Sequence, residues 1–255
     1  MIAALLCPLA RLVAVAVAVG FIACAGTGRS EMMPARDARQ ALLVTTDGWN
    51  ATAGVMRRFI REKPGGAWRQ VGDSMPVVVG RNGLAWGRGI NPAPPAGPRK
   101  HEGDGRAPAG IFRLRSAFGY APRSATEGIR LPYTELTSTI ECVDDSASRS
   151  YNRITDAGSV PAKDWSSSEK MARAGVFYRW GITVDHNTDP AAPGGGSCIF
   201  IHIWGGPSVA TSGCTALDSA NVVSLLAWLD PALAPVLIQL PAAELPALRT
   251  AWDLP

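Results

Sequence analysis

Short apolar stretches separated by glycine- and proline-rich connections occur along most of the chain, and this pattern predicts a protein built mainly from β-strands. Branched and aromatic residues are frequent in these stretches, and they favour a pleated strand. An Asn-Gly pair at 82–83 indicates a hairpin turn, and the connection at 91–110 is expected to be a surface loop. The stretches interpreted as strands are 41–46, 55–62, 68–71, 76–80, 84–86, 111–114, 129–136 and 236–240.

Two further apolar stretches, 178–186 and 198–202, flank a glycine- and proline-rich connection and are expected to pair as antiparallel strands. A register symmetric about residue 192 places Ile182 opposite His202. Side chains alternate along a strand, so every second residue of the later stretch should share one face. Those residues are Cys198, Phe200, His202 and Trp204.

Helical patterns are few and short. Residues 220–229 form an amphipathic pattern preceded by Asp218 or Ser219 as the N-cap. Residues 243–252 are interpreted as a terminal helix, and 168–174 as a short helix inside a polar loop.

Composition agrees with a β-rich, turn-rich protein. The 255 residues are 47% hydrophobic, which is enough to bury a core, and they include 27 Gly and 20 Pro. The formal net charge of +4 is too small to indicate a nucleic-acid partner, and none is expected.

The N-terminal segment has the features of an export signal. An apolar run at 12–23 is too short to span a bilayer comfortably, and an Ala-x-Ala cleavage site follows it. We therefore expect a signal peptide at 1–25, a flexible tether at 26–40 and one folded domain at 41–255. Cys24 also lies in an imperfect lipobox, and lipidation there would anchor the protein to a membrane. The remaining alternative is that the segment stays uncleaved as an anchor. All three interpretations place the protein in the periplasm or cell envelope.

Three cysteines follow the signal region: Cys142, Cys198 and Cys214. An exported protein folds in an oxidising compartment, where three thiols cannot all pair within one chain. A Cys142–Cys198 disulfide would leave Cys214 free. The alternative is that Cys142 and Cys198 are small buried hydrophobic residues.

Cys214 is the strongest candidate nucleophile. It ends a Thr-Ser-Gly-Cys turn, and His202, at the end of an apolar stretch, is close enough in sequence to act as its base. Gly213 permits a sharp turn, and backbone N–H groups from Gly213 to Thr215 are candidates to stabilise an oxyanion. This combination suits acyl transfer. A third group should orient the imidazole, and a backbone carbonyl is one candidate.

Other interpretations of the same residues remain open. Ser212 is a second candidate nucleophile, although it lacks the Gly-x-Ser-x-Gly pattern. His186 is interpreted as a rim or structural histidine, and the acidic pair at 144–145 as turn and capping residues. A zinc site is the remaining possibility, with Cys198, His202, His186 and Cys214 as its ligands.

The segment from His202 to Cys214 resembles the catalytic core of the YkuD-type L,D-transpeptidases, whose motif is a His, a variable loop and Ser/Thr-x-Gly-Cys. His202 matches the base, Thr211 the Ser/Thr, and Cys214 the nucleophile. Pro108-Ala-Gly-Ile-Phe112 is similar to an upstream element of the family. The resemblance covers about residues 41–240.

Two positions depart from the family pattern. Ser212 stands where many members carry His, and Ala216 stands where many carry Arg or Asn. These positions usually shape the acceptor or oxyanion side, so the departures bear on the exact reaction more than on the cysteine chemistry.

The resemblance implies a mainly β fold, a β-sandwich or roll with a few peripheral helices, and a peptidoglycan L,D-transpeptidase active in cell-wall biogenesis. Cys214 would attack the bond between the diamino acid and D-Ala of a stem tetrapeptide, and the thioester would pass to an amine. No metal or organic cofactor is needed. Alternatives are an L,D-carboxypeptidase, in which water replaces the amine, and a non-catalytic cell-wall-binding domain. The expected substrate contacts are Ser197, Trp204, Thr211, Ser212 and His186.

Overall fold

The computed structural model describes residues 33–255, and within them the fold is mainly β, as the sequence predicts. The strands form one mixed sheet of 11 strands and a second sheet of 3, consistent with a β-sandwich. The strands are β1 (Gln40–Thr46), β2 (Ala53–Ile60), β3 (Arg69–Val78), β4 (Leu84–Trp86), β5 (Ala107–Arg113), β6 (Ala117–Gly119), β7 (Tyr133–Glu135), β8 (Ile140–Cys142), β9 (Ile154–Asp156), β10 (Glu169–Lys170), β11 (Trp180–Thr183), β12 (Phe200–Ile203), β13 (Thr215–Leu217) and β14 (Val236–Pro241).

The helices are few and short, as expected. The α-helices are α1 (Ser219–Trp228) and α2 (Leu245–Trp252), and 3-10 turns occupy Arg123–Ala125, Met171–Arg173, Gly175–Tyr178, Pro231–Leu233 and Ala242–Glu244. The Asp218 side chain accepts a hydrogen bond from the Ala220 N–H at 2.8 Å, which confirms Asp218 as the N-cap of α1. α1 packs against β11 and β12, close to the candidate site.

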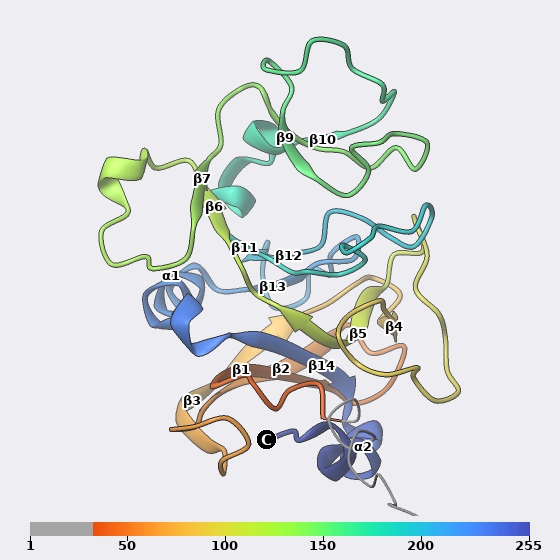
Figure 1. Ribbon diagram of the computed structural model, residues 1–255, viewed down its shortest axis with the longest axis vertical. Helices are drawn as coiled ribbons and strands as arrows, with labels where there is room; N and C mark the ends of the chain where they lie inside the picture. The colour runs from red at the N-terminus through yellow and green to blue at the C-terminus, as the bar shows by residue number, and fades with distance from the viewer. Residues whose placement is uncertain (1–32) are drawn as a thin grey trace, which may run out of the picture.

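The large sheet has the strand order β4-β5-β14-β1-β2-β3-β13-β12-β11-β6-β7 (Figure 1). β1, β2 and β3 form an antiparallel meander, and β14 adds in parallel to β1. The two halves of the sheet meet where β3 contacts β13 through the pair Val78–Ala216. The parallel pair β12–β13 therefore lies beside this junction.

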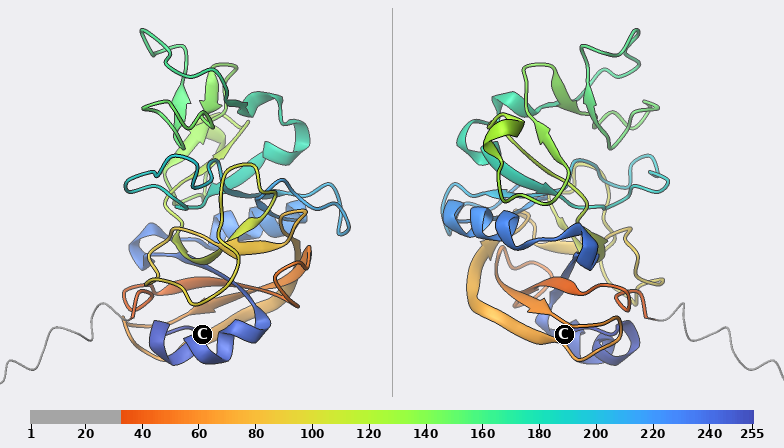
Figure 2. Two further views of the ribbon diagram at one scale, coloured as in Figure 1. Left: turned by 90° about the vertical axis from the view of Figure 1, so that its right-hand side faces the viewer. Right: turned by 60° about the vertical axis from the view of Figure 1, so that its left-hand side comes forward.

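The small sheet, in the order β10-β8-β9, lies at the end of the molecule opposite α2 (Figures 1 and 2). We call the segment 140–170 that carries it the cap. A disulfide between Cys142 and Cys198 joins β8 to the residues just before β12, and Cys214 is free. The open question about the cysteines is thus resolved in favour of the Cys142–Cys198 pairing.

The hairpin predicted at Asn82-Gly83 is wrong, because the strands on either side of the turn do not pair with each other. The tight turn exists, because the Gly83 N–H donates to the Gly80 carbonyl at 2.7 Å and the two residues form an isolated antiparallel bridge. Beyond the turn β3 pairs with β2, whereas β4 pairs in parallel with β5. The longer ladder available to β3 along β2 outweighs the local turn signal.

The antiparallel pairing of β11 with β12 is confirmed, but its register differs by one residue. Gly181, not Ile182, lies opposite His202. The connection between the strands is not symmetric, because Asn187 and Cys198 both adopt a left-handed conformation with φ 54°. Such residues redirect the chain, so the register cannot be read from the centre of the loop.

Several boundaries also differ from expectation. β5 begins at Ala107, inside the predicted loop 91–110, and the predicted helix at 168–174 is instead β10 followed by a 3-10 turn. Ala35 and Ala38 are buried, so packing begins inside the predicted tether at 26–40.

The predicted signal peptide and the anchor at Cys24 lie outside the described residues. Between residues 33 and 255, no helix has the length and apolarity needed to cross a membrane.

Candidate active site

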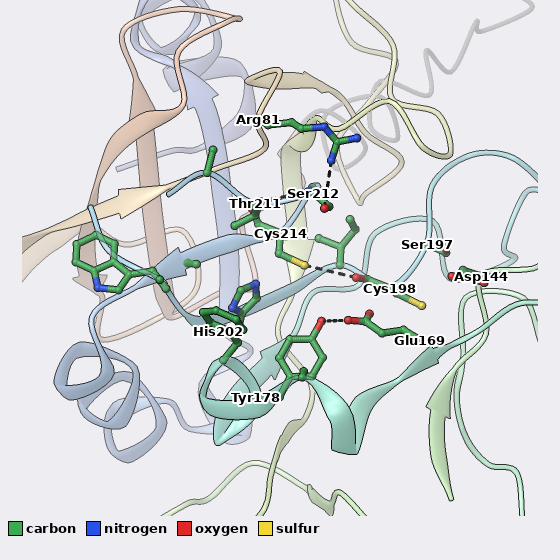
Figure 3. A pocket seen from close by; sticks show the side chains of 18 of the residues that line it. Arg81, Asp144, Glu169, Tyr178, Ser197, Cys198, His202, Thr211, Ser212 and Cys214 are labelled. Carbon is green, nitrogen blue, oxygen red and sulfur yellow. Dashed lines mark hydrogen bonds between the residues drawn. The ribbon is translucent and has the colours of Figure 1, made fainter. Parts of the chain in front are cut away.

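Two parallel strands bring His202 and Cys214 to one face of the large sheet. His202 lies in β12 opposite Ala216 of β13, and Cys214 directly precedes β13. Side chains alternate along a strand, so Cys214 faces the same side as Ala216 and His202. One strand spacing and two residue rises separate them, roughly 8 Å between Cα atoms. In Figure 3 both side chains face the same space.

The turn before the nucleophile is fixed by Thr211. Its hydroxyl accepts from the Gly213 N–H at 3.1 Å and donates to the Cys214 carbonyl at 2.6 Å. Gly213 has φ 156°, and an added Cβ would lie 3.2 Å from the Arg106 carbonyl oxygen, so glycine is needed here as predicted. The Gly213 N–H is therefore occupied, whereas the Cys214 N–H has no hydrogen-bond partner among residues 33–255.

His202 is held in one tautomer. Its Nδ1 lies 2.8 Å from the Ile203 carbonyl oxygen, which can only accept, so Nδ1 carries the proton and Nε2 is the basic nitrogen. The Tyr178 ring packs edge-on against the imidazole, with 5.3 Å between centroids. Burial lowers the pKa of His202, while the bond to Ile203 opposes this effect. The group that orients the imidazole is thus a backbone carbonyl.

The thiol of Cys214 is neutral at rest. Its Sγ accepts from the Phe200 N–H at 3.4 Å and donates to the Cys198 carbonyl at 3.6 Å. Burial raises its pKa to about 12, and the charge of Glu169 adds to this increase. A thiol in this state becomes a thiolate only when a base removes its proton.

The thiol opens into a cavity of about 670 Å³, large enough for a short peptide segment (Figure 3). Its walls come from β12, β13, the cap and the loop 97–106. The residues that line it include Arg81, Lys100, Glu102, Asp144, Glu169, Phe177, Tyr178, Ser197, Cys198, His202, Trp204, Val209, Thr211, Ser212, Cys214 and Ala216.

Cationic groups line one part of this cavity. The Arg81 guanidinium donates to the Ser212 hydroxyl at 3.2 Å. Lys100 pairs with Asp104 at 2.6 Å, and both side chains are almost fully buried. The charge of Lys100 acts to lower the pKa of Cys214, against the larger effect of burial.

Carboxylates line another part. Glu169 accepts from the Tyr178 hydroxyl at 2.5 Å, and Asp144 accepts from the Ser167 hydroxyl at 2.5 Å. Burial raises the pKa of Glu169, and the charge of Asp144 acts in the same direction. The pKa of Tyr178 is also raised, mainly by burial and by the nearby charges of Cys214 and Glu169.

The cavity brings together most of the residues predicted for the site. Ser197, Trp204, Thr211 and Ser212 line it together with His202 and Cys214. Thr215 does not, because its buried hydroxyl donates to Gln239 Oε1 at 2.7 Å on the core side.

His186 lies away from the cavity. It is buried, its Nδ1 accepts from the Arg88 N–H at 3.2 Å and its Nε2 lies 3.0 Å from the Gly195 carbonyl oxygen. The expected substrate contact at His186 is therefore not brought together with the thiol, and the structural interpretation fits its position. The zinc site also fails, since Cys198 is in a disulfide and both His186 nitrogens are engaged. Residues 33–255 contain no other group of His, Cys, Asp and Glu that could hold a metal ion.

Sequence reasoning missed Arg81, Lys100, Glu169 and Tyr178. Arg81 contacts a residue 131 positions away, and its own segment showed only a turn signal. Glu169 lies in a stretch interpreted as a short helix, and Tyr178 lies at the start of a predicted strand. No local pattern identifies such residues, because only the folded sheet and the cap bring them to Cys214.

One family model matches the chain. It describes the YkuD L,D-transpeptidase catalytic domain and matches residues 66–238, which is more than half of the 255 residues. No significant match was found among the curated proteins or among the solved structures.

Proposed function

The chain belongs to the YkuD family of L,D-transpeptidase catalytic domains, and on that premise we propose that it is a peptidoglycan transpeptidase with Cys214 as nucleophile and His202 as base. The observation that carries the proposal is the pairing of a free thiol with an imidazole of fixed tautomer on one face of β12 and β13, at the wall of a peptide-sized cavity. The family acts on peptidoglycan stem peptides.

The first half of the reaction forms a thioester. The Cys214 S–H turns from the Cys198 carbonyl and gives its proton to Nε2 of His202 as Sγ attacks the carbonyl carbon between the diamino acid and D-Ala of a stem tetrapeptide. The unpaired N–H of Cys214 is the candidate donor to the oxyanion, in place of the occupied N–H of Gly213. His202 then protonates the amine of D-Ala, which leaves.

The second half transfers the acyl group. An amine from another stem peptide attacks the thioester carbonyl, the carbon–sulfur bond breaks, and Cys214 regains its proton through His202. The product carries a cross-link between two diamino acids. Burial raises the pKa of the free Cys214 thiol and lowers the pKa of His202, so no thiolate–imidazolium pair needs to be broken before the first attack.

The donor's carboxylates have candidate partners at the cationic part of the cavity. Arg81 lies against Ser212, one of the two departures from the family pattern, and its guanidinium matches a carboxylate in shape and charge. Lys100 lines the same cavity, but its charge is already paired with Asp104. Ala216, the other departure, lies opposite His202 and offers the substrate no polar side chain.

Action on peptidoglycan requires export, and the apolar segment at 12–23 supplies a signal for it. We infer a location in the periplasm or cell envelope on that basis, either as a cleaved protein or anchored through Cys24.

The proposal is tested by incubating the purified protein with tetrapeptide muropeptides and identifying the products by liquid chromatography and mass spectrometry. We expect cross-linked dimers that disappear in Cys214→Ala and persist in Ser208→Ala, an exposed change in the loop that follows β12. Tripeptides without dimers would indicate the carboxypeptidase. Wall binding without any product, equal in both variants, would indicate a non-catalytic wall-binding domain.

A further inference from the structure

Glu169 is a carboxylate in the nucleophile's cavity with no cationic partner among residues 33–255. Its one hydrogen bond is to the neutral Tyr178 hydroxyl, at 2.5 Å. It lines the cavity together with Cys214 and is close enough for its charge to act on the thiol. A partly buried carboxylate without a countercharge attracts a cation that enters the cavity.

The two lysines near Glu169 form salt bridges with a different carboxylate, that of Glu141. Lys170 and Lys163 contact Glu141 at 2.6 Å and 3.3 Å, and Ser168 and Trp165 also donate to it. Both carboxylate oxygens of Glu141 thereby have partners. Burial raises the pKa of Glu141, but the bonds from Lys170 and Ser168 outweigh this effect and hold the pKa at about 2. Glu169, its neighbour in the cap, receives none of this compensation.

The charges of the cavity wall are mixed near Lys100, where the Glu102 carboxylate also lines it, but Arg81 and Glu169 lie apart from each other. In the view of Figure 3, Arg81 and Glu169 lie on opposite sides of Cys214. An anionic donor held at Arg81 would leave the Glu169 side of the thiol open to the second substrate. The acceptor amine is an ammonium at neutral pH, which is the charge that Glu169 complements.

We propose that Glu169 binds the ammonium group of the acyl acceptor and selects cationic amines for transfer, an inference that rests on the proposed function. The ammonium gives one proton to Oε2 of Glu169, and its freed electron pair attacks the thioester carbonyl. The carbon–sulfur bond breaks, a second proton passes from the nitrogen through His202 to Sγ of Cys214, and Glu169 then releases its proton to solvent.

A purely structural role for Glu169 is the competing explanation. Its carboxylate holds the Tyr178 hydroxyl, and the Tyr178 ring packs on His202 and Phe200, so its loss would disturb the imidazole. That disturbance would slow every acceptor equally. A change confined to cationic acceptors requires the charge itself.

The test offers the enzyme a tetrapeptide donor with an equimolar mixture of diaminopimelate and hydroxylamine. At neutral pH both amines of diaminopimelate are ammonium groups, whereas hydroxylamine is uncharged. Mass spectrometry gives the ratio of the diaminopimelate adduct to the hydroxamate, and this ratio is independent of how fast the thioester forms. In Glu169→Gln the ratio should fall about tenfold, the usual scale for losing a charge-assisted contact in a cleft. It should not change in Glu127→Gln, an exposed position outside the cavity.

A second measurement needs no variant. Tetramethylammonium, a cation that cannot react, should suppress the diaminopimelate adduct of the wild-type protein but not the hydroxamate, relative to the same concentration of potassium chloride. An unchanged ratio in Glu169→Gln, or equal suppression of both adducts, would overturn the inference while leaving the transpeptidase intact. Absence of both adducts from the wild-type protein would overturn the proposed function, and this inference with it.

Discussion

His202 keeps its Nδ1 proton on the Ile203 carbonyl and its ring against Tyr178, so Nε2 is the only nitrogen left for proton transfer. Cys214 has a raised pKa because it is buried, and the bond from the Phe200 N–H only partly offsets this effect. In the proposed mechanism the imidazole therefore acts as a base at the moment of attack and not as the partner of a standing thiolate.

This account predicts how Cys214 reacts with iodoacetamide. The thiolate is the reactive form, and a pKa raised to about 12 leaves little of it at neutral pH, so the alkylation rate should still be rising at pH 10. Peptide mapping by mass spectrometry at a series of pH values measures the rate at Cys214 alone. A plateau reached below pH 8 would contradict the account, because it would reveal a stable thiolate–imidazolium pair.

The residues that we propose for the chemistry differ in how well the sequence identifies them. His202, Gly213 and Cys214 are found from the motif, because a turn and a strand end place them within one local unit. Glu169 and Arg81 are not, because the cap and the β3–β4 turn bring them to the cavity from distant segments.

At the scale of elements, the pair β12–β13 positions the site and β14 supports it from the core. The Thr215 hydroxyl donates to Gln239 of β14, and the Gln239 side-chain amide donates to the Pro108 carbonyl of β5 at 2.9 Å. This buried amide links the strand after the nucleophile to two other strands of the sheet.

Gln239→Leu should therefore destabilise the protein by about 1–3 kcal/mol, because it leaves the Thr215 hydroxyl and the Pro108 carbonyl buried without partners. Urea unfolding followed by circular dichroism measures the loss. The control is Gln70→Leu on exposed β3, which should change stability by less than about 0.5 kcal/mol. Equal free energies of unfolding in the two variants would show that the hydrogen bonds of the Gln239 side chain do not stabilise the fold.

Strand existence is easier to predict than strand pairing. Most apolar stretches became strands, including β1, β2 and β14, since their hydrophobic pattern alone defines them. The predicted register of β11 and β12 is wrong by one residue. Residues of left-handed conformation in the connection, Cys198 among them, redirect the chain. The predicted pairing of β3 with β4 is wrong because β3 pairs with the preceding strand β2, whereas β4 pairs with β5 beyond a long connection.

At the scale of the whole molecule, the cap is joined to the catalytic face by the Cys142–Cys198 disulfide. Glu169 pairs with Cys142 across β10 and β8, so the same strands carry the cavity's carboxylate and the covalent link. The Cys198 carbonyl also accepts from the thiol of Cys214. A shift of the cap would therefore move Cys198, and with it the carbonyl that the Cys214 thiol contacts.

Replacing both cysteines, as Cys142→Ser with Cys198→Ser, should lower stability by about 2–4 kcal/mol, since the bond closes a separation of 56 residues. Product formation from muropeptides should also fall, because the cap no longer holds Glu169 beside the thiol. Dithiothreitol should reproduce both effects in the wild-type protein and add nothing in the double variant. Full stability and activity after reduction would refute this role.

The central claim is that Cys214 carries the acyl group. The most direct measurement is the mass of the intact protein after brief mixing with a tetrapeptide muropeptide, followed by mapping of the modified peptide. The account predicts an added mass equal to the muropeptide minus D-Ala, located on Cys214 and absent from Cys214→Ala. An adduct on Ser212, or release of D-Ala without any dependence on Cys214, would contradict it.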